Sequence, residues 1–134
     1  MAHVTDYLEE LFTFINRTPT AYHAVANSVD ILSRKGFNRL DESASWQDLS
    51  PGSYYLTRNG SSLIAFTLAN QPHTGLPLRM AGAHTDSPSL KIKPNPLQLR
   101  HGCVQLGVEV YGGALLAPWF DRELSLAGRV SVLD

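Results

Sequence analysis

The 134-residue sequence has few of the features expected of extracellular, membrane-bound or nucleic-acid-binding proteins. Cys103 is its single cysteine, so no disulfide can form within the chain and a reducing compartment fits best. The sequence has eleven lysines and arginines and twelve aspartates and glutamates, so it carries no excess of positive charge with which to bind nucleic acid or an anionic membrane. No apolar run approaches the roughly twenty residues that span a bilayer, and the first residues do not resemble a secretory signal. We therefore expect a soluble, intracellular chain with no nucleic-acid or membrane partner.

Hydrophobic residues make up 43% of the sequence and charged residues 17%, which excludes a disordered chain and allows a real core. Apolar residues recur three and four positions apart over residues 4–15 and again over 21–32, which predicts two amphipathic helices. Thr5 is expected to cap the first helix, and Gly36 to end the second.

The pattern then changes to the period of β-strands. Residues 54–58 and 62–68 are β-type runs joined through Asn-Gly at 59–60, the strongest short signal for a hairpin. A turn is expected at residues 74–77, and the apolar run at 78–83 predicts a strand covered on both faces.

The rest of the chain has the pattern of antiparallel β-structure. Residues 91–96 contain two prolines and predict a loop or edge segment. Residues 104–111 alternate between apolar and polar side chains, as in a strand with one buried face, and the alternation returns over 124–132. The order of elements predicts an α/β (mixed α and β) fold. Because residues 130–134 stop in mid-alternation, we expect the carboxyl end to be a truncation.

Chemistry is expected at residues 80–88, where His84 follows the predicted buried strand and Asp86 lies two positions on. In an extended backbone both side chains project from the same face, so the carboxylate can accept a hydrogen bond from the imidazole. That bond would fix the tautomer of His84 as a metal ligand. On the motif alone, a capping histidine and a turn aspartate beside Ser87 are an equally good interpretation.

Three separated parts of the sequence carry a recognisable pattern: residues 19–25 (PTAYHAV), residues 83–88 (AHTDSP) with 91–94 (KIKP), and residues 110–113 (VYGG) followed by 119–124 (WFDREL) and 127–130 (AGRV). Together, and in this order, they resemble the M18 family, the aspartyl aminopeptidases. Residues 114–118 depart from the family pattern, which affects local detail only.

The resemblance implies a cytoplasmic metallopeptidase with two zinc ions that releases acidic residues, Asp or Glu, from the amino terminus of peptides. By the same resemblance His84 is a zinc ligand and Asp86 the catalytic residue that orients it. The zinc ions would lower the pKa of the attacking water. The family's other ligands and its general base lie beyond residue 134, so this piece alone is expected to be inactive.

The resemblance also implies a homo-oligomer, with the amino-terminal part of the catalytic domain at residues 1–94 and the start of a β-rich dimerisation domain at 95–134. The cluster at 121–123 would then belong to an interface, and an exposed charge cluster is the alternative. A hypothesis of a different class is a natural short protein that keeps the family's surfaces as a non-catalytic binding or assembly module.

Other chemically capable residues favour structural roles. Cys103 would need a partnered histidine and a positive environment to act as a nucleophile. His23 is expected at the surface or in packing, and His101 in a turn before Gly102. Ser87 lies outside any Gly-x-Ser-x-Gly elbow, which disfavours a serine hydrolase.

Overall fold

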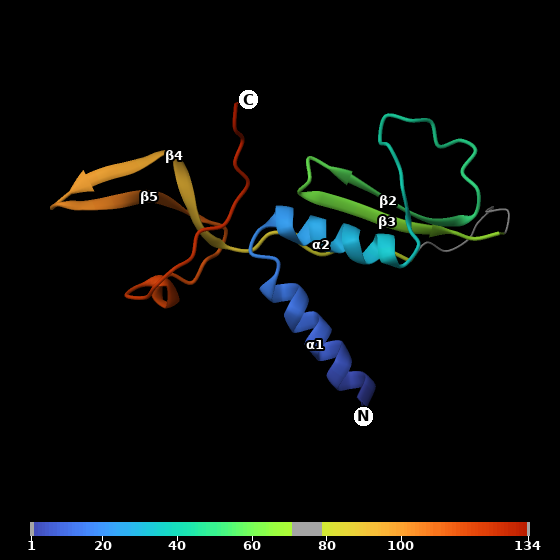
Figure 1. Ribbon diagram of the computed structural model, residues 1–134, viewed down its shortest axis with the longest axis horizontal. Helices are drawn as coiled ribbons and strands as arrows, with labels where there is room; N and C mark the ends of the chain where they lie inside the picture. Colours follow the sequence, from blue (N-terminus) through green and yellow to red (C-terminus); the bar gives the residue numbers. More distant parts are fainter. Residues whose placement is uncertain (1, 71–78, 134) are drawn as a thin grey trace. The chain divides into compact units, whose positions relative to one another are not determined.

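The computed structural model describes residues 2–70 and 79–133, with side chains from residue 4 onward (Figure 1). The chain divides into two compact units: the described residues up to Asp86 with those after Leu126, and Ser87–Leu126. Helices and antiparallel strands are both present, which confirms the α/β class. The elements are α1 (Ala2–Asn16), α2 (Ala21–Arg34), β1 (Asn38–Arg39), β2 (Gly52–Arg58), β3 (Ser62–Leu68), β4 (Ser89–Arg100), β5 (Cys103–Tyr111) and the 3-10 helix η1 (Ala117–Trp119).

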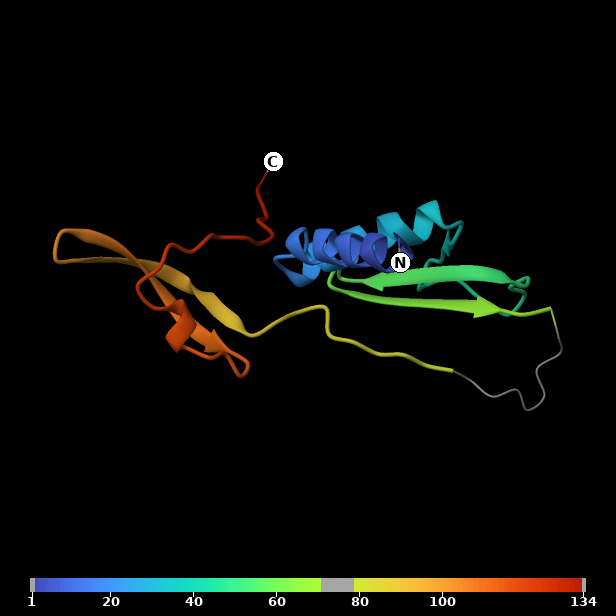
Figure 2. The same cartoon turned by 90° about the horizontal axis from the view of Figure 1, so that it is seen from below.

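The first unit is built on a three-stranded sheet in the order β1-β2-β3, with β1 parallel and β3 antiparallel to β2. Figure 2 shows α2 lying along one face of this sheet. The buried apolar side chains of the described residues are Val25 of α2 with Tyr55 and Leu56 of β2. The Tyr55 hydroxyl also lies 3.2 Å from the Ser33 hydroxyl of α2. The core of this unit is therefore the contact between α2 and β2.

Both ends of α2 follow from its sequence. Thr20 precedes the helix in extended backbone, and its hydroxyl oxygen accepts a hydrogen bond from the His23 N–H. At the other end Gly36 has a φ of +80°, and the Phe37 N–H donates to the Leu32 carbonyl at 3.0 Å. The expected carboxyl end at Gly36 is confirmed.

The expected cap at Thr5 is wrong, because α1 extends over Ala2–Asn16 and Thr5 lies inside it. No proline or glycine stands between Ala2 and Thr5, so nothing there stops the helix from continuing a turn further. Among the described residues, neither α1 nor any other helix is long and apolar enough to cross a membrane.

The predicted hairpin is confirmed: β2 and β3 pair from Gly52↔Leu68 to Arg58↔Ser62. Asn59 and Gly60 between them have φ values of 53° and 66°. This left-handed backbone costs most residues energy, but glycine adopts it freely and asparagine tolerates it. The turn at residues 59–61, called the 59–61 turn below, therefore depends on these residue types.

In the second unit, β4 and β5 form an antiparallel hairpin whose turn contains His101 and Gly102, both with positive φ. The expected turn at His101 is confirmed. Of the two alternatives expected for residues 91–96, the loop is wrong and the edge segment is confirmed, because these residues lie within β4, one of the two strands of its sheet. The prolines nevertheless have a local effect: the register shifts between Ile92 and Leu97, since proline has no N–H to donate to a ladder.

The predicted strand at 104–111 is confirmed as β5, but its predicted buried face is wrong. The alternating apolar side chains of β5 are exposed, from 38% at Val108 to 73% at Val104. A two-stranded ribbon has no second layer to cover one of its faces. The hairpin β4–β5 therefore presents an open apolar face.

Two other predicted strands are absent from the described residues. Residues 79–84 and 123–133 have no regular secondary structure and are exposed. A strand is stable only beside a neighbour that pairs its backbone N–H and C=O groups, and neither segment has such a neighbour among the described residues. The expected turn at 74–77 and the first residue of the predicted strand, Leu78, lie outside the described residues.

Replacing Gly60 with alanine is expected to destabilise the first unit by about 1–2 kcal/mol, because alanine is strained at a positive φ. The control is Gly128→Ala: the alanine Cβ would meet no atom within 4 Å and φ there is not positive, so we expect a change below about 0.5 kcal/mol. The measurement is the free energy of unfolding in urea. Equal effects of the two substitutions would contradict the role of the left-handed turn.

Candidate functional site

The structure brings His84 and Asp86 together in the first unit. The Nδ1 atom of His84 lies 3.1 Å from the Oδ1 atom of Asp86. The His84 side chain is 92% exposed and that of Asp86 is 38% exposed. The two residues are in contact even though the strand expected before them is not formed. The extended backbone expected between them is also wrong, because the chain bends at Thr85.

The hydrogen bond decides which ring nitrogen of His84 is available. An ionised carboxylate can only accept, so a bond with Asp86 requires the Nδ1 atom of His84 to carry the proton. The Nε2 atom then has a lone pair for a metal ion, and an imidazole held by a carboxylate is a common arrangement among metal-ligating histidines. The pair therefore has the chemistry of one metal ligand and the group that orients it.

The described residues supply only part of a metal site. Zinc is usually held by three or four protein ligands drawn from His, Cys, Asp and Glu. Among residues 2–70 and 79–133, no group of three or more such side chains lies close enough to hold a metal ion. His84 fits zinc by its chemistry, and further ligands would have to come from outside this set.

Thr85, between the two residues, is fixed to a different part of the first unit. Its Oγ1 atom donates a hydrogen bond of 2.8 Å to the carbonyl oxygen of Ser61, in the 59–61 turn. Thr85 is half-buried, unlike its neighbour His84. Nothing in the sequence pattern indicates this contact, because it joins residues 24 positions apart.

Arg129, which lies in the carboxyl-terminal segment of the first unit, contacts the same turn. Its guanidinium lies 4.2 Å from the centre of the Tyr22 ring, in cation–π geometry, and donates to the Asn59 carbonyl at 3.1 Å. Sequence reasoning missed both Thr85 and Arg129 as functional candidates.

The remaining candidate residues identified from the sequence lie outside the pair formed by His84 and Asp86. Cys103 is exposed at the first position of β5. His23 is exposed on α2, with its Nδ1 atom 2.8 Å from the Thr20 hydroxyl oxygen, which agrees with the expected surface position. Arg122 donates to the Pro118 carbonyl at 3.2 Å, and the interface expected at residues 121–123 stays a prediction.

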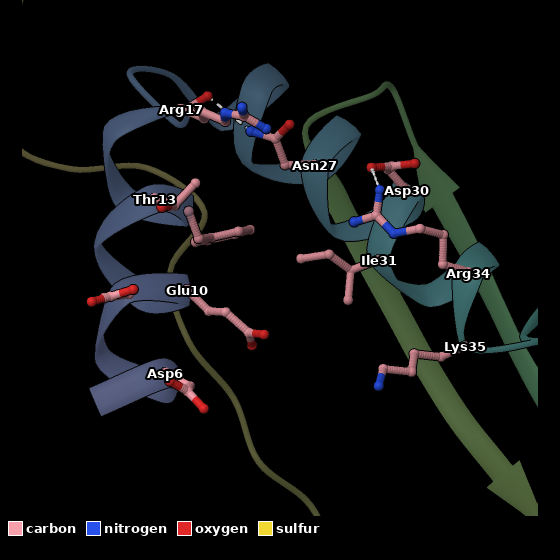
Figure 3. Close-up of a pocket in the computed structure, with 11 residues that line it drawn as sticks. Asp6, Glu10, Thr13, Arg17, Asn27, Asp30, Ile31, Arg34 and Lys35 are labelled. Carbon is pink, nitrogen blue, oxygen red and sulfur yellow. Dashed lines mark hydrogen bonds and ion pairs between the residues drawn. The ribbon is translucent and has the colours of Figure 1, made fainter. Parts of the chain in front are cut away.

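A cleft of about 830 Å³ lies between α1 and α2 (Figure 3). Carboxylates of α1, including Asp6 and Glu10, line one side of the cleft. The other side is lined by Arg34 of α2 and by Lys35, the residue that follows this helix. Arg34 forms an ion pair with Asp30 of its own helix. The lining residues include no imidazole or thiol, so the cleft lacks the groups that would indicate a reaction.

Comparison with known proteins gives a consistent result. The family model for "Aminopeptidase I zinc metalloprotease (M18)" matches residues 14–134. The chain is 52% identical over 126 residues to the Probable M18 family aminopeptidase 2 of Ectopseudomonas mendocina (strain ymp), covering 94% of this chain and 29% of that protein. It is 56% identical over 121 residues to the protein of the same name from Pseudomonas putida (strain F1), covering 90% and 28%. The chain thus spans less than a third of the length of these curated relatives.

Solved structures are also similar. The mApe1 structure from Chaetomium thermophilum matches with a TM-score of 0.80 and 36% identity, covering 87% of this chain and 27% of that one. The S. cerevesiae mApe1 dodecamer matches with a TM-score of 0.72 and 29% identity, covering 90% and 28%.

In the metal-free protein at neutral pH, we expect the proton of neutral His84 to reside on Nδ1, because the Asp86 carboxylate can only accept. Long-range proton–nitrogen NMR correlations report this tautomer. Asp86→Asn should remove the preference, since an amide can donate as well as accept, while the signals of His23 stay unchanged as an internal control. A proton on Nε2 of His84 in the unsubstituted protein would contradict the assignment.

Proposed function

The chain belongs to the M18 family of zinc aminopeptidases, and from this premise we propose that it is the amino-terminal part of an enzyme that removes amino-terminal residues from peptides. The observation that supports the proposal most directly is the contact between His84 and Asp86, which lies inside the segment matched by the family model. The related proteins are more than three times as long as this chain, so we expect further metal ligands to lie outside the described residues.

In the proposed enzyme, His84 holds a zinc ion through its Nε2 atom. Asp86 keeps the proton on Nδ1 and thereby fixes the direction in which the imidazole presents its lone pair. Bound zinc supplies Lewis-acid chemistry, polarising a carbonyl and lowering the pKa of a water molecule. Two zinc ions would need several more carboxylates and a second imidazole, so we propose that residues 1–134 alone are inactive.

We propose that the substrates are peptides with an acidic amino-terminal residue, Asp or Glu. We also propose that the protein is located in the cytoplasm, because a chain with a single cysteine fits a reducing compartment. We also propose residues 1–94 as the amino-terminal part of the catalytic domain and 95–134 as the start of a dimerisation domain. The open apolar face of the hairpin β4–β5 supports an interface there, and the related mApe1 of S. cerevesiae is a dodecamer. The proposed enzyme is accordingly a homo-oligomer.

The protein expressed from its complete reading frame, supplied with zinc, should release Asp and Glu from amino-acyl reporter substrates at least about tenfold faster than Leu or Lys. Residues 1–134 expressed alone should release none, because one imidazole and one carboxylate cannot hold the catalytic metals. Zinc-dependent turnover by the isolated piece would contradict its inactivity, and equal rates for Leu would contradict the acidic preference. A reading frame that ends at Asp134 would favour a non-catalytic binding or assembly module instead.

In the same protein, His84→Ala should abolish zinc-dependent activity, because it removes a metal ligand. Asp86→Asn should lower zinc affinity less, within about 10–100-fold, and slow turnover because the tautomer is no longer fixed. The matched control is His23→Gln, which changes an exposed histidine of α2 and should leave zinc content and rate unchanged. Wild-type kinetics in both the His84 and the Asp86 variants would show that the metal-site assignment is wrong.

A further inference from the structure

The 59–61 turn accepts hydrogen bonds from two segments that are far apart in the sequence. The Ser61 carbonyl accepts from the Thr85 hydroxyl at 2.8 Å, and the Asn59 carbonyl accepts from the Arg129 guanidinium at 3.1 Å. Backbone carbonyls at a tight turn are not used by the β2–β3 ladder, so they are available to hold other parts of the chain. The turn therefore connects the hairpin with residues 85 and 129.

The position of Thr85 makes its bond important for the proposed metal site. Thr85 stands between His84 and Asp86, and residues 79–84 have no regular secondary structure that would fix them. The Thr85 side chain is half-buried against the hairpin, while His84 is 92% exposed. The backbone bends at Thr85, and His84 and Asp86 are its two neighbours in the chain. A bond that fixes the Thr85 side chain therefore limits how far the backbone of these two neighbours can move, since one planar peptide unit joins each of them to Thr85.

The turn is itself held in place from α2. Arg129 stacks on the Tyr22 ring of α2 while it bonds the Asn59 carbonyl. A Cβ on Gly60 would lie 3.9 Å from the Tyr22 ring and 4.0 Å from the Arg129 guanidinium, so these three groups are in close proximity. The carbonyl that Thr85 bonds thus belongs to a turn that is tied to the packed part of the first unit.

We propose that Thr85 is a positioning residue for the metal site: its hydrogen bond to the Ser61 carbonyl holds His84 and Asp86 in the arrangement in which the imidazole can bind zinc. The inference rests on the proposed function. It assigns a role to the 59–61 turn, which itself contributes no metal ligand.

The test uses the protein expressed from its complete reading frame and four variants. Thr85→Val replaces the hydroxyl by a methyl group of similar shape, and Thr85→Ala removes the hydroxyl without adding a methyl near the Ser61 carbonyl. Thr85→Ser keeps the hydroxyl. Thr67→Val is the matched control, because it makes the same change at an exposed position of β3. Three quantities are measured: the zinc affinity, by competition with a chelating dye, the absorption spectrum of the Co²⁺-substituted protein, and the Tm of the metal-free protein.

We expect Thr85→Val and Thr85→Ala to weaken zinc binding about tenfold and to alter the Co²⁺ spectrum, as changes around a metal-ligating histidine generally do. Thr85→Ser should restore the affinity, and Thr67→Val should not change it. The Tm of the metal-free Thr85 variants should stay near that of Thr67→Val. Unchanged zinc affinity in both hydroxyl-deleting variants would overturn the inference, and so would a loss that accompanies a lowered Tm and is not restored by serine.

His84→Ala, measured in the same way, separates this inference from the proposed function. Loss of zinc in His84→Ala with unchanged affinity in Thr85→Val would overturn the role of Thr85 and leave the proposed function supported. Retention of zinc by His84→Ala would overturn both.

Discussion

The left-handed backbone at Asn59 and Gly60 is the local constraint on which the first unit depends. It lets β2 turn back onto β3 so that the sheet presents one face to α2, where Val25, Tyr55 and Leu56 are buried. It also leaves two turn carbonyls for Thr85 and Arg129. The hairpin and the attachment of the segment that carries His84 thus follow from one asparagine–glycine pair.

The elements that could be predicted from the sequence are those fixed by neighbours along the chain. The helical periods, the end of α2 at Gly36 and the Asn-Gly hairpin each depend on a few consecutive residues, and the structure confirms them. The strands expected at 78–83 and 124–132 were predicted from apolar patterns that need a pairing partner, and the described residues give them none. An apolar pattern shows that a segment can form a strand, but the strand forms only where a neighbouring strand pairs with its backbone.

The same distinction applies to the candidate site. The contact between His84 and Asp86 was predictable because the two residues are only two positions apart, although the backbone between them bends at Thr85 and is not extended as expected. The bonds of Thr85 to Ser61 and of Arg129 to Asn59 were not, because hydroxyl and guanidinium groups carry no periodic signal and their acceptors are backbone atoms. Groups that support a site from a distance in sequence are therefore found only once the fold is known.

The two strands of the β4–β5 hairpin differ in their ability to pair with a further strand. Pro94 and Pro96 remove two N–H donors from β4, which makes it a poor template for another strand. β5 has no proline, and apolar residues such as Val104 and Leu106 alternate along it. A third strand, if one were added, would pair more readily with β5 than with β4, because β5 keeps all its backbone N–H donors.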